Sequence, residues 1–516
     1  MTSGPDRSAR TDAAAAAPHP PLTKRQVLSG LRCHKKLWLE VNENEAHELE
    51  INDELRVRFA EGRVVGDEAQ KHSGAGLMLA PRGDADIAKV ATRTRDAMAN
   101  GESLLFEAGF IAAGAGIRAD IMRRDGDGEQ ATWSITEVKQ SKLPEKERER
   151  DKKLALHLAD VAVQAWVAHA ANVQVAASNL MLLNPACRHP DLSNLFLTTD
   201  VTARTLPVIQ ALPGAVATMQ DVLRLEAAPQ TPVGDQCTDP DECPFYDRCH
   251  DALPPHHVSE LYYAKKLAKA FEAAGKTMIA DLTEADAPNL PAKRQVRAVK
   301  SGKRIVEPGL AAALGSLKAP IAYFDFETVQ LAVPRWPGCG PQDMVAVQFS
   351  VHREGFADNT TRQYLARRGG DPRPALIDAM VEACAGAGSI VVYYEAFEKS
   401  RIKELAAAFP TREAELMDIH DRIVDLLPIV RDHVYDPEFH GSFSLKKVLP
   451  ALVPDLTYEG LAIQEGMAAT AAIYLMLFDE SMDQASQDAL RRDLLAYCHR
   501  DTEAMVHLVA ELRKLA

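Results

Sequence analysis

The sequence has few cysteines, no long apolar run and no excess of basic residues. No stretch of its 516 residues holds the roughly 18 consecutive apolar side chains of a membrane span. Eight cysteines in this length do not form a disulfide scaffold, so we expect a reducing, cytoplasmic setting. With a net charge of −14, any contact with nucleic acid must come from local patches.

The first residues also lack the apolar core of a signal peptide. They contain five consecutive alanines and few other apolar side chains, which predicts a disordered tail. The length requires several domains. We expect a tail over residues 1–20, a first domain over 21–255, a helical and basic connector over 256–315, and a second domain over 316–516.

The stretch IAYFDFETV contains two carboxylates separated by one residue, Asp325 and Glu327. Alternate residues of a strand share a face, so both side chains should project together. Close carboxylates repel each other unless a cation lies between them or one binds a proton. Mg²⁺ or Mn²⁺ fits carboxylate oxygens. The alternative is an exposed acidic strand end.

Two more motifs follow this stretch. SIVVYYEAFEKS predicts a buried strand that runs into a helix and delivers Glu398 near the strand end. LLAYCHRDTEAM predicts a helix with Tyr497 and Asp501 one turn apart on one face. Taken alone, that pair is equally explained as a helix surface pair.

A separate constellation lies in the first half of the chain. Asp120 lies on one arm of a predicted hairpin, and Glu137 and Lys139 share a face of the other arm. Such a set can hold a divalent cation that lowers the pKa of a bound water, with the lysine beside a phosphate. Gln164 follows on the next predicted helix. The alternative is a surface strand with an ion pair.

Four cysteines are spaced unlike a common structural zinc site. Cys33 lies far upstream, and Cys237, Cys243 and Cys249 follow C-x5-C-x5-C spacing, without tight C-x2-C pairs. The other four have no partner at suggestive spacing, and we interpret them as buried apolar residues. These are Cys187, Cys339, Cys384 and Cys498.

The first constellation resembles the RecB-like branch of the PD-(D/E)XK nuclease superfamily. The resemblance assigns the two acids and the lysine of the hairpin to the catalytic motif, and Gln164 to the glutamine motif. The usual aromatic after that glutamine is displaced to Trp166, and the usual histidine on the first helix is missing. Glu68 or Glu107 would supply a ligand in its place.

The cysteine arrangement is similar to that of iron–sulfur nucleases, including AddB and the CRISPR-associated RecB-like exonucleases. This resemblance implies that Cys33, Cys237, Cys243 and Cys249 hold a [4Fe–4S] cluster that joins the two ends of the domain. Zinc at these cysteines and ordinary unliganded thiols remain the alternatives.

The motifs of the second half resemble the DEDD exonuclease family, in its tyrosine subtype. The resemblance implies an RNase H-like fold and 3′→5′ removal of nucleotides with two metals about 4 Å apart. Asp325, Glu327, Glu398 and Asp501 would bind metal, and Tyr497 would orient or deprotonate the attacking water. The second motif departs from N-x2-F-D, because it has tyrosine for asparagine and glutamate for aspartate.

Together the two resemblances imply an α/β protein. Its first domain would be restriction-endonuclease-like with an iron–sulfur cluster, and its second RNase H-like with a mixed sheet. The expected function is a Mg²⁺- or Mn²⁺-dependent nuclease, with DNA favoured as substrate, in repair, recombination or defence. The alternatives are an RNA exonuclease and a nucleic-acid-binding protein with weakened catalysis. No membrane partner is expected.

Overall fold

The computed structural model describes residues 20–126, 128–250 and 252–516, which form two compact units. The first unit contains residues up to 50, 65–183 and 196–250, and the second contains 51–64, 184–195 and 251–516. The predicted tail lies outside the described residues except for residue 20. None of the described helices is long and apolar enough to span a membrane.

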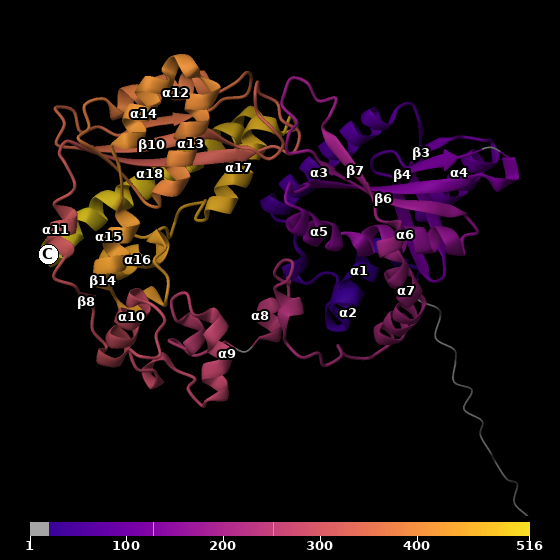
Figure 1. Cartoon of the computed structure of the whole chain (residues 1–516), viewed down its shortest axis with the longest axis horizontal. Helices are drawn as coiled ribbons and strands as arrows, with labels where there is room; N and C mark the ends of the chain where they lie inside the picture. The colour runs from indigo at the N-terminus through magenta and orange to yellow at the C-terminus, as the bar shows by residue number, and fades with distance from the viewer. Residues whose placement is uncertain (1–19, 127, 251) are drawn as a thin grey trace, which may run out of the picture. The chain divides into compact units, whose positions relative to one another are not determined.

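The first unit is built on one mixed sheet of seven strands (Figure 1). Six strands run in the order β2-β3-β4-β5-β6-β7, and β1 pairs with β4 in parallel. The hairpin predicted to carry the acidic residues is confirmed as the antiparallel pair β4 and β5. The strands are β1 (Leu22–Thr23), β2 (Leu77–Met78), β3 (Leu104–Ala112), β4 (Ala115–Asp125), β5 (Thr132–Lys142), β6 (Val175–Leu183) and β7 (Phe196–Asp200).

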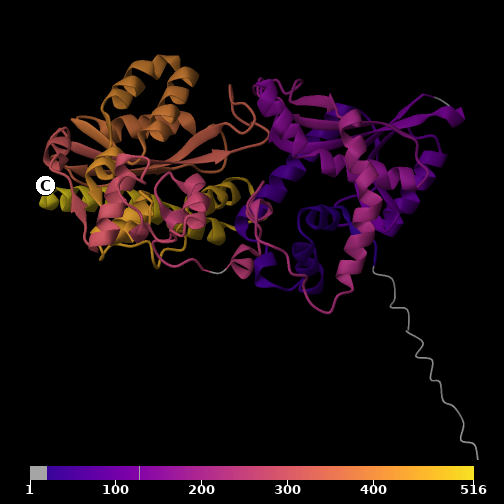
Figure 2. The ribbon, with the colours of Figure 1, turned by 60° about the horizontal axis from the view of Figure 1, so that its bottom comes forward.

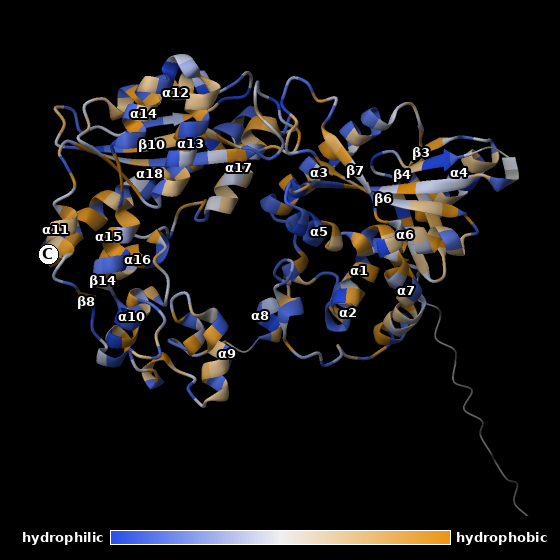
Figure 3. Ribbon diagram, viewed as in Figure 1, coloured by the Kyte–Doolittle hydropathy of each residue, from blue (hydrophilic) through white to orange (hydrophobic). Residues whose placement is uncertain are grey.

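Helix α6 (Leu158–Ala170) packs against four neighbouring strands, β3 to β6. Its residues 161–168 are all buried, and it is coloured largely in the hydrophobic range in Figure 3. The helix predicted to carry Gln164 is α6, and a break at Leu156 and His157 separates it from α5 (Glu147–Ala155). The other helices are α1 (Lys24–Arg32), α2 (His34–Asn42), α3 (Asp53–Ser73), which begins in the second unit, α4 (Ile87–Ala99), α7 (Thr202–Leu223) and α8 (Tyr246–Cys249).

The second unit contains a five-stranded mixed sheet in the order β11-β10-β9-β12-β13. Strand β10 pairs antiparallel with both β9 and β11, whereas β12 and β13 run parallel to β9. The strands are β9 (Ile321–Gln330), β10 (Met344–Glu354), β11 (Arg362–Leu365), β12 (Ser389–Val392) and β13 (Ile423–Asp425).

Side chains of β9 alternate between two cores. Ala322, Phe324 and Phe326 belong to the core under α12 (Arg373–Cys384), α13 (Glu395–Ala408) and α14 (Glu413–Asp421). Ile321 and Tyr323 belong to a core on the other face, which includes residues of α18 (Gln484–Leu515). Figures 1 and 2 show α12 and α14 on one side of this sheet and α18 on the other. The acidic residues of β9 therefore project toward the α18 side.

The predicted connector is packed within the second unit, and its residues contribute to two of that unit's cores. It is mostly helical, but it also contributes strand β8 (Ile305–Val306), which pairs antiparallel with β14 (Val434–Tyr435). The remaining helices of this unit are α9 (Lys265–Ala273), α10 (Leu290–Ser301), α11 (Leu310–Leu314), α15 (Leu426–His433), α16 (Leu445–Leu452) and α17 (Gly466–Phe478). Mixed sheets with covering helices confirm the α/β class.

Candidate functional site

Three predicted metal ligands meet in the second unit. Asp325 and Glu327 project from β9, and Asp501 projects from α18, which covers that face of the sheet. Each can offer a carboxylate oxygen within 4.8 Å of the other two. The period of the strand places Asp325 and Glu327 on one face, and the packing of α18 on that face brings Asp501 to them.

These carboxylates line a cavity of about 420 Å³. Five tyrosines share its wall, and four of them form two adjacent pairs, Tyr262–Tyr263 and Tyr393–Tyr394. Tyr263 is 84% exposed and Tyr394 is 57% exposed, so their rings are available to a ligand. The other lining residues are Leu427, Phe443, Ser444, Leu445, Lys446, Tyr497 and Met505.

The electrostatics of the three acids favour a bound cation. Burial, and then the charges of the neighbouring acids, raise the pKa of Asp325 and of Glu327 well above their usual values. The pKa of Asp501 rises to about 6, chiefly through burial, and a hydrogen bond from Tyr458 and the charge of Lys446 oppose that rise. Three oxygen donors that repel one another when ionised are the ligand set that a hard divalent cation prefers.

Tyr497 lies beside the acids as predicted, and two residues that we did not predict join it. The Tyr458 hydroxyl donates a hydrogen bond to Asp501 Oδ1 at 2.5 Å. Cys498 Sγ lies 3.8 Å from Asp325 Oδ2. Tyr458 is in an irregular loop without a motif, so no sequence signal marked it, whereas Cys498 directly follows Tyr497 and could have been considered.

Glu398 is not part of the group of three. It is only 2% exposed, it does not line the cavity, and its Oε2 has no hydrogen-bond partner among the described residues. Burial raises its pKa to about 8. Its charge still raises the pKa of Asp325 and of Glu327, so it lies near enough to act on both.

The first unit brings its predicted residues into a second cluster. Glu137 is 2% exposed and pairs with Lys139 at 2.8 Å. The Gln164 side-chain amide donates a hydrogen bond to Glu137. The carboxylate of Asp120 accepts a hydrogen bond of 2.8 Å from the backbone N–H of Val138. The hairpin and α6 therefore position the predicted set as the sequence suggested.

A lysine that we did not predict dominates the charge of this cluster. Lys24 Nζ lies 2.9 Å from both oxygens of Glu137. Burial alone would raise the pKa of Glu137, but Lys24 and Lys139 outweigh it and lower that pKa to about 2. The pKa of Asp120 rises to about 7, first through burial and then through the charge of Glu137. Lys24 was missed because β1 and β4, whose pairing places it there, carry no local signal for that pairing.

Of the two candidates for the missing ligand, the structure places Glu107 at the cluster. It lies on β3 between Phe106 and Ala108, which pair with the two neighbours of Asp120 on β4, and it has a positive φ of 55°. Burial raises its pKa, and the charge of Glu137 raises it further. Glu68 instead pairs with Lys71 at 2.7 Å.

The four cysteines predicted to act together line one pocket of the first unit, next to Arg32 and Lys36. Among the described residues, two groups of three or more potential ligands have their atoms within 4.8 Å of one another, and neither contains a cysteine. A single tetrahedral zinc would need sulfur atoms about 3.8 Å apart. The four sulfur atoms are therefore not gathered as closely as a single zinc ion would require. The other four cysteines are buried, as predicted.

Comparison with known proteins leaves the function open. Residues 322–444 match the sequence model of a family described as a domain of unknown function, DUF2779. The match includes Asp325, Glu327 and Glu398, and it ends before Asp501. No solved structure gave a significant match.

Three mycoplasmal proteins are similar to part of the chain. An uncharacterised MG366 homologue of Mycoplasma pneumoniae is 27% identical over 37% of this chain and 32% of its own length. The uncharacterised UU173 of Ureaplasma parvum is 24% identical over 39% of this chain and 32% of its own length. The uncharacterised MG366 of Mycoplasma genitalium is 23% identical over 39% of this chain and 33% of its own length. The aligned region thus covers about a third of each relative.

Proposed function

We propose that the protein is a divalent-metal-dependent nuclease whose principal active site is the acidic cavity of the second unit. The observation that carries this proposal is the group formed by Asp325, Glu327 and Asp501 beneath exposed tyrosines. Carboxylates that gather metal beside aromatic rings suit a nucleic acid strand, whose phosphates bind the metal and whose bases stack.

The three carboxylates would hold Mg²⁺ or Mn²⁺, which activates water and stabilises the charge that develops on the phosphate. Lys446, on the cavity wall with its Nζ 5.3 Å from the Tyr497 ring, is placed to contact a phosphate. Burial and the neighbouring acids raise the pKa of Tyr497. It therefore stays protonated and orients water through its hydroxyl instead of removing a proton.

The exposed tyrosines suggest a single strand as substrate. Tyr263 and Tyr394 are the most exposed aromatic residues in the cavity wall. Aromatic rings stack on bases of any sequence, at about 1–3 kcal/mol per base, but a paired and stacked duplex does not offer these base faces. The predicted 3′→5′ removal of nucleotides requires such an unpaired end.

We also propose a fold type for each unit and a cofactor for the first. A mixed sheet with its acids on the central strand supports an RNase H-like second unit of DEDD type. The cluster of Asp120, Glu137, Lys139 and Gln164 supports a RecB-like PD-(D/E)XK first unit. The shared pocket of the four cysteines supports a [4Fe–4S] cluster. We favour DNA over RNA, a cytoplasmic setting, and a role in repair, recombination or defence.

One observation favours a second candidate, a nucleic-acid-binding protein with weakened catalysis. Glu398, the fourth acid of the predicted site, lies outside the group of three. A site with three acids would bind one metal ion more readily than two metal ions. The tyrosines would still bind a nucleic acid strand.

A nuclease assay separates these candidates. Purified protein with Mn²⁺ is offered single-stranded DNA, duplex DNA and RNA, each labelled at one end. We expect degradation of single-stranded DNA that Asp325→Ala reduces at least about 100-fold, the usual scale for loss of a catalytic group. Asp120→Ala and the double variant report whether the first unit contributes. If wild type binds a strand but cleaves none of the substrates, the result favours a nucleic-acid-binding protein with weakened catalysis. Cleavage confined to RNA would favour the RNA exonuclease.

A further inference from the structure

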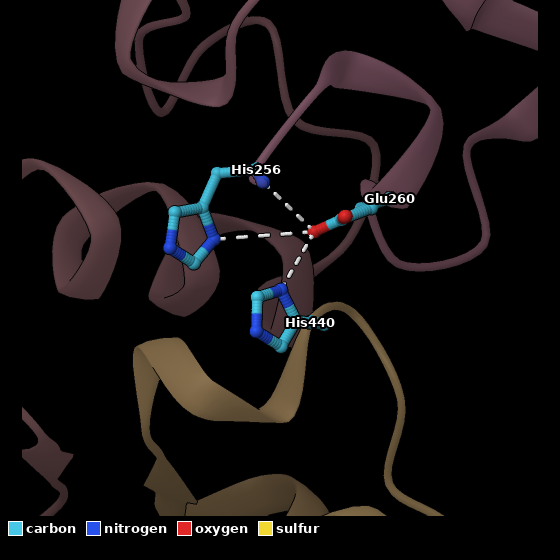
Figure 4. A group of neighbouring side chains, drawn as sticks. All are labelled: His256, Glu260 and His440. Atoms are coloured by element: carbon cyan, nitrogen blue, oxygen red, sulfur yellow. Dashed lines mark hydrogen bonds and ion pairs between the residues drawn. The ribbon is translucent and has the colours of Figure 1, made fainter. Parts of the chain in front are cut away.

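A second group of potential metal ligands lies in the second unit, apart from the acidic cavity. His256, Glu260 and His440 can each offer one atom within 4.8 Å of the others. Both histidines point a ring nitrogen at one oxygen of Glu260 (Figure 4). The Nδ1 of His440 lies 3.2 Å from that oxygen, and the Nδ1 of His256 lies 3.9 Å from it.

The hydrogen bonds of this group leave one nitrogen without a partner. The His440–Glu260 contact is short enough for a hydrogen bond, but the His256–Glu260 contact is not. The Nδ1 of His256 is buried and has no hydrogen-bond partner among the described residues. A buried nitrogen that lacks a partner is costly, and a metal ion between the three side chains would satisfy it.

The two imidazole rings stack with centroids 4.9 Å apart and an interplanar angle of 9°. Both histidines also have positive φ, 64° for His256 and 48° for His440. Such conformations are unfavourable for residues with a side chain, and they occur where the surrounding structure holds a functional geometry.

Hydrogen bonds and close packing fix the backbone around these ligands. The carbonyl oxygen of Glu260 accepts a hydrogen bond of 2.9 Å from the Gln295 side chain. Gly441, next to His440, packs so closely on that carbonyl that a Cβ would lie 1.7 Å from the oxygen. The backbone N–H of Gly441 donates to the Tyr435 hydroxyl at 2.9 Å. The ligands are therefore positioned by contacts that do not involve the metal.

We propose that His256, Glu260 and His440 bind one transition-metal ion of the Zn²⁺ class. Two imidazoles and one carboxylate suit Zn²⁺, Co²⁺ or Ni²⁺, whereas Mg²⁺ and Ca²⁺ prefer oxygen ligands alone. Three protein ligands leave one coordination position for water. This proposal does not depend on the nuclease function.

The position of the site gives the ion a structural role. Glu260 lies two residues before Tyr262, and His440 lies three residues before Phe443, and both aromatic residues line the acidic cavity. Their rings contact each other edge to face, with centroids 4.9 Å apart. A metal that joins the two segments would hold this part of the cavity wall in place.

Cobalt binding to the full-length protein tests the site. The protein is treated with chelator, supplied with excess Mg²⁺ so that the acidic cavity is occupied, and titrated with Co²⁺. We expect one equivalent with the strong visible absorption of four-coordinate Co²⁺. Glu260→Gln and His440→Ala should weaken this binding more than about 100-fold, because a ligand is removed. The same titration of the Cys243→Ser protein identifies the absorption that comes from Co²⁺ bound to thiolates, because this variant keeps the three proposed ligands.

The matched control is His420→Ala. His420 also pairs with a carboxylate, Asp421, at 2.9 Å. Within the described part of the chain it also has an unpartnered buried nitrogen, but it belongs to no group of three ligands. It should bind cobalt like wild type. Zn²⁺ should raise the melting temperature of wild type and His420→Ala but not that of Glu260→Gln, whose melting temperature in chelator should match wild type. Unchanged cobalt binding in Glu260→Gln and His440→Ala, or no binding by wild type, would overturn the proposal.

Discussion

Replacing Asp501 by asparagine should stabilise the second unit when metal is absent and the pH is neutral or higher. The pKa of Asp501 rises from 3.8 to about 6 on folding. A carboxyl with a raised pKa destabilises the fold once it ionises: the cost is absent below pH 3.8, grows up to about pH 6 and then stays constant. At about 1.4 kcal/mol per pKa unit, the cost above pH 6 is about 3 kcal/mol.

Asparagine removes this cost and keeps an oxygen that can accept the hydrogen bond from Tyr458. Asp501→Asn should therefore be more stable than wild type by up to about 3 kcal/mol at pH 8, and equal to it near pH 4. Amide hydrogen exchange of β9 and α18 in chelator measures this difference locally, without assuming that a chain of two units unfolds in one step. Exchange rates are corrected for the intrinsic effect of pH.

The exposed Asp488 on the same helix provides the control. Asp488→Asn should leave protection unchanged at both pH values. Mn²⁺ should then protect wild type strongly and Asp501→Asn weakly, because the variant has lost a ligand. The reasoning is refuted if Asp501→Asn lowers protection at pH 8, or if Mn²⁺ protects both proteins equally.

Three further outcomes follow from particular residues. Tyr263→Ala and Tyr394→Ala should each weaken binding of single-stranded DNA about tenfold, measured by fluorescence anisotropy, and unchanged binding by both would remove the stacking role. Gly441→Ala should lower the unfolding free energy by about 3 kcal/mol or more in denaturant titrations, because of the clash with Glu260 and its positive φ. Gly460→Ala, with positive φ but nothing within 4 Å, should cost only about 1–2 kcal/mol, and equal costs would contradict the clash. Protein purified without oxygen should be brown, and Cys243→Ser should lose that colour; a colourless wild type or a brown variant would argue against the cluster.

Local periodicity was sufficient for the parts of the site that lie on single elements. Asp325 and Glu327 share a face because a strand repeats every two residues, and Tyr497 and Asp501 share one because a helix turn spans about four. The position of Glu398 could not be predicted, because it depends on how α13 rotates over the sheet and on the longer side chain of glutamate.

Residues brought together by distant segments were missed. Lys24 reaches Glu137 only because β1 pairs with β4, and a two-residue strand has too little pattern to indicate its partner. His256 and Glu260 meet His440 through close packing at Gly441, which a sequence shows only as one more glycine in a loop. The break between α5 and α6 was likewise hidden, because the residues on both sides favour helix.

The most direct test of the account is the position of Mn²⁺ in crystals of the full-length protein. Anomalous scattering from Mn²⁺ should give a peak between the carboxylates of Asp325, Glu327 and Asp501, and Asp325→Asn crystals should lose it. Crystals soaked in Mn²⁺ without any peak at these carboxylates would contradict the proposal that the cavity is a metal-dependent active site.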